Sequence, residues 1–524
     1  MPPRIMKVIG CPGTGKTFFL LRQIEKATEK YEPSRIGAVS FTQAAIFEMR
    51  DRVSKIIGPT KAASKNIRTI HSHAFKLLQL NKSQIVDSNA SHIREWNSAF
   101  PNWALPAGLN STELEEEPIL ENSYSTTENR KIHQFMNILR NRCIPVSLWP
   151  KEAGGLGERA VSFWRDWSNW LSENELWDFT KILEKCKKLK LRPEIDILFA
   201  DESQDMTQLQ LDLTEIWSQE CDVVIYSGDS DQAIFRWAGS SPEVFENLKH
   251  DWEQVLPQSY RVPQKVHEYA LKLIRCLGTR RADISYLPTN VEGRMEAGRR
   301  LFPDLDREGS HMILCRCQYQ IRRWQKYLTT KGLPWHNPYR DAPGWNPTDS
   351  KLWKAVQTYD EIIRGLEVYA QDVRRMISLT YVAGNLEPGI KTQVKKLLPN
   401  PYDKYDVFSL SDKGWFTPEW FKFQRPLDAL FGLEGGAGDL LRVKGREIVR
   451  ETPRIMLGTI HSVKGGEADH VWLDTTSSPT IARSIMDNQQ AGDDETRLIY
   501  VAVTRARQSC GLLAPVGIPN NVIL

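Results

Sequence analysis

The stretch that decides the fold is Gly10-Cys11-Pro12-Gly13-Thr14-Gly15-Lys16-Thr17, which fits the pattern G-x-x-x-x-G-K-[ST] in full. It follows an apolar run that predicts a buried strand, and a helical pattern begins near Lys16. In that context, backbone N–H groups and the helix N-terminus face phosphate oxygens. We therefore predict a phosphate-binding loop, with Lys16 on the β- and γ-phosphates and the Thr17 hydroxyl on Mg²⁺. The alternative is a structural glycine-rich turn.

An acidic stretch, residues 201–205 (DESQD), follows the apolar run IDILFA. Acidic residues at the carboxyl end of a strand lie where α/β sheets bind ligands. Asp201 is suited to hold Mg²⁺, and Glu202 to orient or deprotonate an attacking water. The alternative is an acidic helix cap, which the same residue types also favour.

Composition excludes several classes of protein. The 524 residues are 41% hydrophobic and 26% charged with a net charge of +4, which excludes a disordered chain and a collagen-like fibre. The eight cysteines form no C-x-x-C pair, and Cys315 and Cys317 are predicted to be core thiols. The cysteine pattern favours a reduced protein. No apolar run approaches the length of a membrane span, so we also expect the protein to be soluble and cytoplasmic.

Short β-branched runs alternate with helical stretches, which favours α/β units with parallel strands. Two segments, 82–193 and 336–452, are too long to be loops within a compact domain and are predicted to be inserted subdomains. The predicted strands span residues 5–10, 35–41, 195–200, 222–227, 311–315, 454–458, 470–474 and 509–513.

Taken together, its motifs show that the chain resembles the UvrD/Rep-type helicases of superfamily 1. Eight motifs besides the phosphate loop occur in that family's order, which is far more specific than any one of them. Besides the phosphate loop and the acidic stretch, they are SFTQAA (40–45), TIHS (69–72), GDSDQAIFRW (228–237), SYR (259–261), the segment 313–322, TIHSVKGGE (459–467) and YVAVTRAR (500–507).

The resemblance implies two RecA-like P-loop NTPase domains, each with an inserted, mainly helical subdomain. It divides the chain into a first RecA-like domain (1–81 and 194–256) with an inserted helical subdomain (82–193), and a second RecA-like domain (257–335 and 453–524) with an inserted accessory subdomain (336–452).

It also implies residue roles at the matching positions. Gln232 senses the γ-phosphate, Tyr260 stacks on adenine, and Glu467 hydrogen-bonds the ribose. Arg261 and Arg505 reach the γ-phosphate from the second core. The implied catalytic set is Lys16, Asp201, Glu202, Gln232, Arg261 and Arg505, and the implied DNA-facing set is Phe41, Thr69, His71, Phe235, Trp237 and His461.

The implied activity is ATP-dependent, Mg²⁺-dependent unwinding of DNA by 3′-to-5′ movement on a single strand. Two alternatives stay open: a translocase that strips proteins from single strands, and a nucleotide-switched clamp with little turnover. The expected partners are single-stranded DNA, single/double-strand junctions and replication or repair proteins, with no membrane. We expect a monomer or weak self-association.

The chain departs from the family pattern at three points. No glutamine-bearing segment precedes the phosphate loop, so nucleotide choice is expected to be relaxed. Ala44 replaces a family lysine, and Ala238 replaces the arginine of W-R-G.

Two further patterns fall in the first insertion. Phe163, Trp167, Trp170 and Trp177 are predicted to share a helical face, either as core or as a base-stacking platform. The basic run 185–190 predicts either a solvated helix face or a duplex-binding patch.

Overall fold

The computed structural model describes residues 2–40, 43–57, 65–87, 89–106, 124–153, 155–278, 285–339, 345–418, 420 and 436–516. The chain forms two compact units. The first comprises residues 1–301, 464–467 and 475–524, and the second comprises residues 302–463 and 468–474.

A six-stranded sheet, in which every pairing is parallel, forms the centre of the first unit. Its order is β3-β2-β4-β5-β1-β6, so β5 lies between β4 and β1. The central strands are buried on both faces, as parallel strands covered by helices must be. The strands are β1 (Arg4–Gly10), β2 (Ile36–Ser40), β3 (Ile67–Thr69), β4 (Ile197–Ala200), β5 (Val223–Gly228) and β6 (Trp252–Leu256).

The strands predicted at 5–10, 35–41, 195–200 and 222–227 are present with small shifts at their ends, and the α/β class is confirmed. Strands β3, β6 and β7 (Arg294–Arg300) are not among the predicted strands. β3 has only three residues, and β6 lies at the sheet edge and is mostly exposed.

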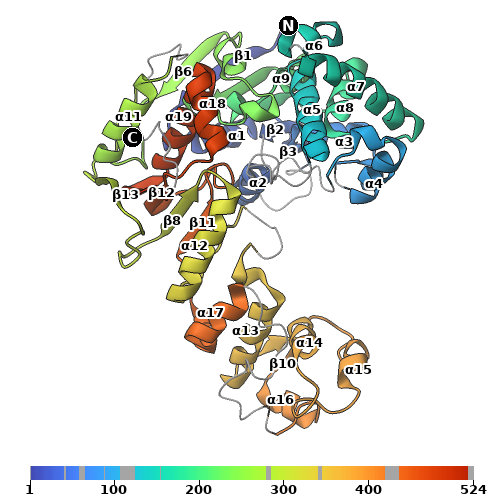
Figure 1. Ribbon diagram of the computed structural model, residues 1–524, viewed down its shortest axis with the longest axis vertical. Coiled ribbons are helices and arrows are strands. Elements are labelled where there is room, and N and C mark those ends of the chain that lie inside the picture. Colours follow the sequence, from blue (N-terminus) through green and yellow to red (C-terminus); the bar gives the residue numbers. More distant parts are fainter. Residues whose placement is uncertain are drawn as a thin grey trace. The chain divides into compact units, whose positions relative to one another are not determined.

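Helices and one further strand pair complete the first unit around this sheet (Figure 1). β7 (Arg294–Arg300) pairs in parallel with β13 (Ala506–Leu513). The helices outside the insertion are α1 (Lys16–Ala27), α2 (Gln43–Ile57), α3 (Ile70–Leu77), α9 (Gln208–Ser218), α10 (Pro242–Glu246), α11 (Gln264–Arg275), α18 (Pro479–Asp487) and α19 (Gln489–Val503).

Among the described residues, five helices follow α3 and precede β4 in sequence, and they fall within the segment 82–193 predicted to be an inserted subdomain. Phe163, Trp167 and Trp170 lie on the buried face of one of these helices, α7, and pack with Trp96. The core interpretation of these aromatic residues is therefore confirmed. Trp177 follows the helix end instead and pairs its backbone with Ile85. The helices are α4 (Ala90–Ala99), α5 (Tyr124–Asn141), α6 (Trp149–Ala153), α7 (Gly155–Glu173) and α8 (Phe179–Leu189).

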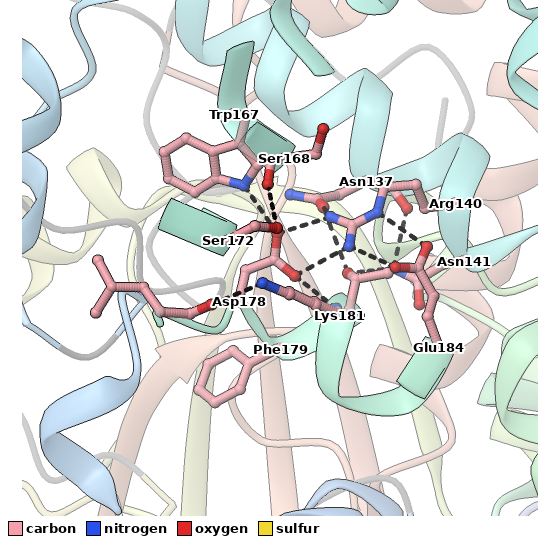
Figure 2. Close-up of polar contacts among 12 residues, drawn as sticks. Asn137, Arg140, Asn141, Trp167, Ser168, Ser172, Asp178, Phe179, Lys181 and Glu184 are labelled. Carbon is pink, nitrogen blue, oxygen red and sulfur yellow. Dashed lines mark hydrogen bonds and ion pairs between the residues drawn. The ribbon is translucent and has the colours of Figure 1, made fainter. Parts of the chain in front are cut away.

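A buried ion network holds α5 to the start of α8 (Figure 2). The Arg140 guanidinium donates to Asp178 Oδ2 at 2.7 Å and to Glu184 Oε2 at 2.7 Å. Trp167 Nε1 also donates to Asp178, at 2.8 Å. Burial by itself raises the pKa of Asp178, but Arg140 and these hydrogen bonds outweigh it and hold the pKa at about 2. Asp178 is thus ionised and fully partnered, as a buried charge requires.

The second unit contains three parallel strands in the order β11-β8-β12. They confirm the strands predicted at 311–315, 454–458 and 470–474: β8 (His311–Cys315), β11 (Ile455–Thr459) and β12 (Ala468–Asp474). Cys315 and Cys317 are buried, as predicted. In sequence, α12 (Gln318–Lys331) follows β8.

The elements between α12 and β11 are mainly helical, as expected of the second insertion (Figure 1, yellow to orange). Buried Asp360 ties its first helix to a later segment by accepting two hydrogen bonds from Arg450, at 2.7 and 2.8 Å. Its elements are α13 (Lys351–Ile363), β9 (Val368–Tyr369), α14 (Ala370–Leu379), α15 (Ile390–Leu397), β10 (Lys404–Tyr405), α16 (Val407–Asp412) and α17 (Gly436–Lys444).

Within the described parts of both units, none of the helices is long and apolar enough to cross a bilayer.

Replacing Asp178 with Asn should lower the free energy of unfolding by about 3 kcal/mol at neutral pH, because Arg140 would lose its buried carboxylate and keep only the partly exposed Glu184. The pKa of Asp178 lies below its ordinary value of 3.8, so its contribution is present above that pH and is lost as the pH falls through about 2. Urea unfolding of the variant should therefore depend less on pH in acid than that of the wild type. Asp51→Asn, in an exposed pair with Lys55, is the control, and equal stabilities of the two variants would contradict the prediction.

Candidate active site

The phosphate-loop sequence occupies the turn between β1 and α1, which is the strand–loop–helix context the motif requires. Gly13 adopts φ +73°, and a Cβ at this position would lie 2.5 Å from Arg261 Cβ. A side chain is therefore excluded there by both conformation and space. Lys16 Nζ donates to the Gly10 carbonyl at 2.7 Å, so the ammonium lies across the loop. The loop is thus shaped to place backbone N–H groups and one lysine around phosphate oxygens.

Asp201 lies beside this loop because β4, β5 and β1 are neighbours and end at the same edge of the sheet. Its Oδ2 accepts from Thr17 Oγ1 at 3.2 Å, and its Oδ1 accepts from Ser227 Oγ at 2.7 Å. Burial, followed by the neighbouring Glu202 charge, raises the pKa of Asp201. A hydroxyl next to a carboxylate is the kind of hard oxygen pair that Mg²⁺ prefers. The two residues predicted to hold Mg²⁺ are therefore brought together and fit the ion.

Glu202 is held by a strained backbone and several positive charges. Its φ of +51° is unusual for a residue with a side chain, and such strain gathers at functional sites. Gln204 Nε2 donates to its Oε2 at 2.5 Å. Burial raises the pKa of Glu202, but the charges of Lys16 and Lys464 and the hydrogen bond from Gln204 outweigh it, leaving the pKa at about 2. An ionised acceptor at this position can orient or deprotonate a water.

A chain of hydrogen bonds leads from Glu202 to Arg505. Gln204 Oε1 accepts from the Asp229 backbone N–H at 3.0 Å, and Asp229 Oδ2 accepts from Gln232 Nε2 at 2.5 Å. Gln232 Oε1 then accepts from Arg505 Nη2 at 3.0 Å. The predicted Gln232 and Arg505 are therefore in direct contact.

Lys464 joins the same network from another motif. It forms an ion pair with Asp205 and donates to the Gln232 carbonyl at 2.8 Å. Burial raises the pKa of Asp205 to about 6, and the Lys464 charge opposes that rise. Gln204 and Lys464 carry no predicted role, although both lie within the quoted segments 201–205 and 459–467. Their position inside those motifs is the only signal that marks them in the sequence.

Tyr260 is anchored to the phosphate loop through its backbone, because its N–H donates to the Gly13 carbonyl at 2.8 Å. Its side chain is 79% exposed, which leaves a ring face free beside the loop. Arg261 Nε donates to Glu467 Oε2 at 2.5 Å, and Glu467 also pairs with Arg507. Burial raises the pKa of Glu467, but these two arginines lower it overall. The residues expected at the base, ribose and γ-phosphate thus adjoin the loop, with Glu467 already engaged by arginines.

Two of the predicted DNA-facing residues lie next to this network. Phe235 is only 8% exposed, and the Lys464 ammonium lies 5.2 Å from its ring centroid. Trp237 is half-buried, 6.1 Å from Phe235 between ring centroids. Its Nε1 is buried and has no hydrogen-bond partner among the described residues. The indole N–H of Trp237 is thus a buried donor without an acceptor among the described residues.

The other residues predicted to face DNA lie outside this hydrogen-bond network. Thr69 caps α3 by accepting from Ser72 N–H at 3.2 Å. His71 is half-buried against the edge of Phe179, and burial lowers its pKa to about 4, so it is neutral at pH 7. His461 follows β11 in the second unit. Phe41 lies outside the described residues.

Comparison with known proteins gives relatives of one kind. "ATP-dependent DNA helicase Rep" of Buchnera aphidicola subsp. Acyrthosiphon pisum is 24% identical over 617 positions, covering 96% of this chain and 91% of that protein. "Probable DNA helicase" of Mycoplasma pneumoniae is 27% identical over 273 residues, covering 48% of this chain and 50% of its own length. "ATP-dependent DNA helicase PcrA" of Bacillus subtilis is 26% identical over 280 residues, or 50% of this chain and 36% of its own length. The chain therefore spans about half or less of the length of the last two relatives.

Two family descriptions match the chain itself. The UvrD/REP helicase N-terminal domain matches residues 2–253, which include the loop, the acidic stretch and Gln232. The UvrD-like helicase C-terminal domain matches residues 440–512, which include Lys464, Glu467 and Arg505. The chain therefore belongs to the UvrD/Rep helicase family.

Proposed function

We propose that the protein is an ATP-dependent DNA helicase that moves on single-stranded DNA, 3′ to 5′, and couples hydrolysis to duplex unwinding. One observation carries the proposal. A continuous set of contacts joins the acidic residues beside the phosphate loop to Arg505 and, through Lys464, to the aromatic pair Phe235 and Trp237. The relatives named as ATP-dependent DNA helicases support it.

The roles of the residues follow from their contacts. The phosphate loop and Lys16 bind and orient the triphosphate, while Thr17 and Asp201 hold Mg²⁺. The ion would neutralise charge on the phosphate oxygens when bound. Glu202, ionised at neutral pH, accepts a hydrogen bond or proton from the attacking water. Arg261 and Arg505 stabilise charge that develops on the transferred phosphoryl group, an effect typically worth about 10³–10⁵ in rate.

Gln232 links the nucleotide site to the residues that we assign to DNA. Its side chain contacts Arg505, and its carbonyl shares Lys464 with the ring of Phe235. A change at the γ-phosphate that moves Gln232 therefore also moves the segment carrying Phe235 and Trp237. The exposed ring of Tyr260 is assigned to the nucleobase, and Thr69, His71, Phe41 and His461 are assigned to the strand.

We assign the ATP-binding core to residues 1–81 and 194–256 with an insertion at 82–193, and the second core to residues 257–335 and 453–524 with an insertion at 336–452. These boundaries place each insertion between consecutive strands of one core.

Lys16→Ala should reduce ATP hydrolysis by about 10²–10³-fold, because it removes a preorganised cation from the transferring phosphoryl group. The measurement is steady-state ATPase activity with and without single-stranded DNA. Lys26→Ala, an exposed lysine on the same helix, is the matched control. An unchanged turnover in Lys16→Ala would contradict the site, and tight strand binding by a wild type that hydrolyses nothing would favour the clamp.

Glu202→Gln should lower the rate of hydrolysis by about 10²–10⁴-fold while ATP still binds, because the amide cannot accept the proton. Single-turnover hydrolysis and nucleotide binding measured on the same preparation separate the two effects. Glu220→Gln, in a surface pair with Arg192, should behave as wild type. Retention of normal turnover by Glu202→Gln would show that another group handles the water.

Trp237→Ala should weaken single-strand binding by about 1–3 kcal/mol, the usual value of one base–aromatic stack, and leave ATP binding unchanged. Fluorescence anisotropy with a labelled oligothymidylate measures the loss. Trp252→Ala, on the partly exposed edge strand β6, is the control. If strand affinity and DNA stimulation both survive in Trp237→Ala, the residue has a packing role only.

Direction is tested separately by unwinding of duplexes that carry either a 3′ or a 5′ tail. Preferential unwinding from the 3′ tail is expected, and use of the 5′ tail alone would overturn the assigned direction. Displacement of bound protein from a strand without unwinding of either duplex would favour the stripping translocase.

A further inference from the structure

A hollow of about 550 Å³ lies in the first unit where the helical insertion meets α9 and α10. It is large enough to admit a phosphodiester group with water. Five of the residues that line it are charged: Arg142, Arg236, Lys249, Glu215 and Glu243. These charged side chains differ in how completely neighbouring residues pair with them.

Arg236 is neutralised within the protein. Its Nε donates to Asp494 at 3.2 Å, and its Nη2 lies 3.4 Å from both oxygens of Glu243. Glu243 also accepts from the Ser241 hydroxyl. Arg236 is therefore paired by two carboxylates of the protein, Asp494 and Glu243.

Arg142 is not neutralised in this way. Its backbone N–H donates to the Ile138 carbonyl at 2.9 Å, but its side-chain Nε is buried with no hydrogen-bond partner among the described residues. Burial, and then the nearby Arg236 charge, lowers its pKa, while the charges of Glu243, Asp494 and Glu152 oppose that fall. A desolvated guanidinium next to another cation is costly unless an anion joins it. Lys249 is exposed on the same rim, and its charge acts on Glu215 of the same lining.

The remaining acid of the lining, Glu215, does not pair with Arg142. Burial and the neighbouring Asp212 charge raise the pKa of Glu215, and the charges of Lys249 and Lys187 oppose that rise. None of the described lining residues therefore accepts a hydrogen bond from the Arg142 Nε.

The position of Arg142 ties the hollow to the turn that carries Trp237. Arg142 directly follows the last residue of α5, Asn141. A Cβ on Gly239, two residues after Trp237, would lie 2.9 Å from Asn141 Cβ, so the end of α5 packs against this turn. Ala238 contributes no charge to the turn. Arg142 therefore stands beside the segment assigned to the strand.

We propose that Arg142, assisted by Lys249, binds a backbone phosphate of the single strand that contacts Trp237. The phosphate would accept a hydrogen bond from the buried Arg142 Nε, and the guanidinium would fix the register of the strand relative to Trp237. Such contacts position a strand without reading its sequence. This proposal rests on the proposed function, since it requires a bound strand.

The test is the salt dependence of oligothymidylate binding, measured by anisotropy on the full chain. Each lost phosphate contact should reduce the slope of log affinity against log salt by about 0.7 for a single strand. Arg142→Ala and Lys249→Ala should each show a reduced slope, and Arg142→Lys should retain most of it. Arg165→Ala, an exposed arginine on α7 of the same insertion, is the matched control and should keep the wild-type slope.

The outcomes separate this proposal from the proposed function. A wild-type slope in both Arg142→Ala and Lys249→Ala overturns the phosphate site, even when the wild type binds DNA and is stimulated by it. Weaker binding with an unchanged slope also overturns it, because that result points to disturbed packing of the Trp237 turn. Lys249 is exposed, so its variant remains informative if Arg142→Ala unfolds. A wild type that binds no single strand contradicts the proposed function itself.

Discussion

The parallel pairing of β4, β5 and β1 is the constraint on which the rest of the site depends. In this register Ile9 pairs with Gly228, and Ala200 pairs with Tyr226, so three strands end at one edge of the sheet. The phosphate loop, Asp201 and the segment beginning at Gly228 are thereby brought together from positions about two hundred residues apart. Loops at the carboxyl ends of parallel strands are the usual place for ligand chemistry.

Several buried carboxylates gather at that edge, and their neighbours decide which are charged. Glu202 faces Lys16 and Lys464 and has a pKa of about 2, whereas burial raises the pKa of Asp201 and of Asp229. Such divergence between neighbouring acids is a common mark of an active site, because each group needs a different protonation behaviour. Lys464 and Arg505, whose charges help to hold Glu202 ionised, also contact Gln232, so charge at the nucleotide site and the segment leading to Trp237 are physically linked.

The helical insertion follows a different physical principle. Its tryptophans are packed against one another, and the Arg140–Asp178–Glu184 network is closed within the protein. A satisfied buried network fixes the geometry of helices but leaves nothing to bind a ligand. The end of α5 differs, because Arg142 lies just beyond that network and its buried Nε has no hydrogen-bond partner among the described residues. Within this insertion, the fully paired charges around Arg140 stabilise the packing of the helices, whereas the unpaired Nε of Arg142 is available to bind a ligand.

The sequence by itself determined the α/β class, most strands, the phosphate loop and the ordered motifs of the family. These are local signals: apolar runs for buried strands, a glycine-rich turn before a helix, and acids after a strand. It missed β3 and β6, which are short or exposed, and it placed Trp177 on a helix that ends at Glu173. The contacts of Gln204 with Glu202 and Asp229, of Lys464 with Gln232, and the isolation of Arg142 were decided only by the tertiary structure. Pairing of charges depends on which side chains meet in space, and spacing along a chain does not specify that.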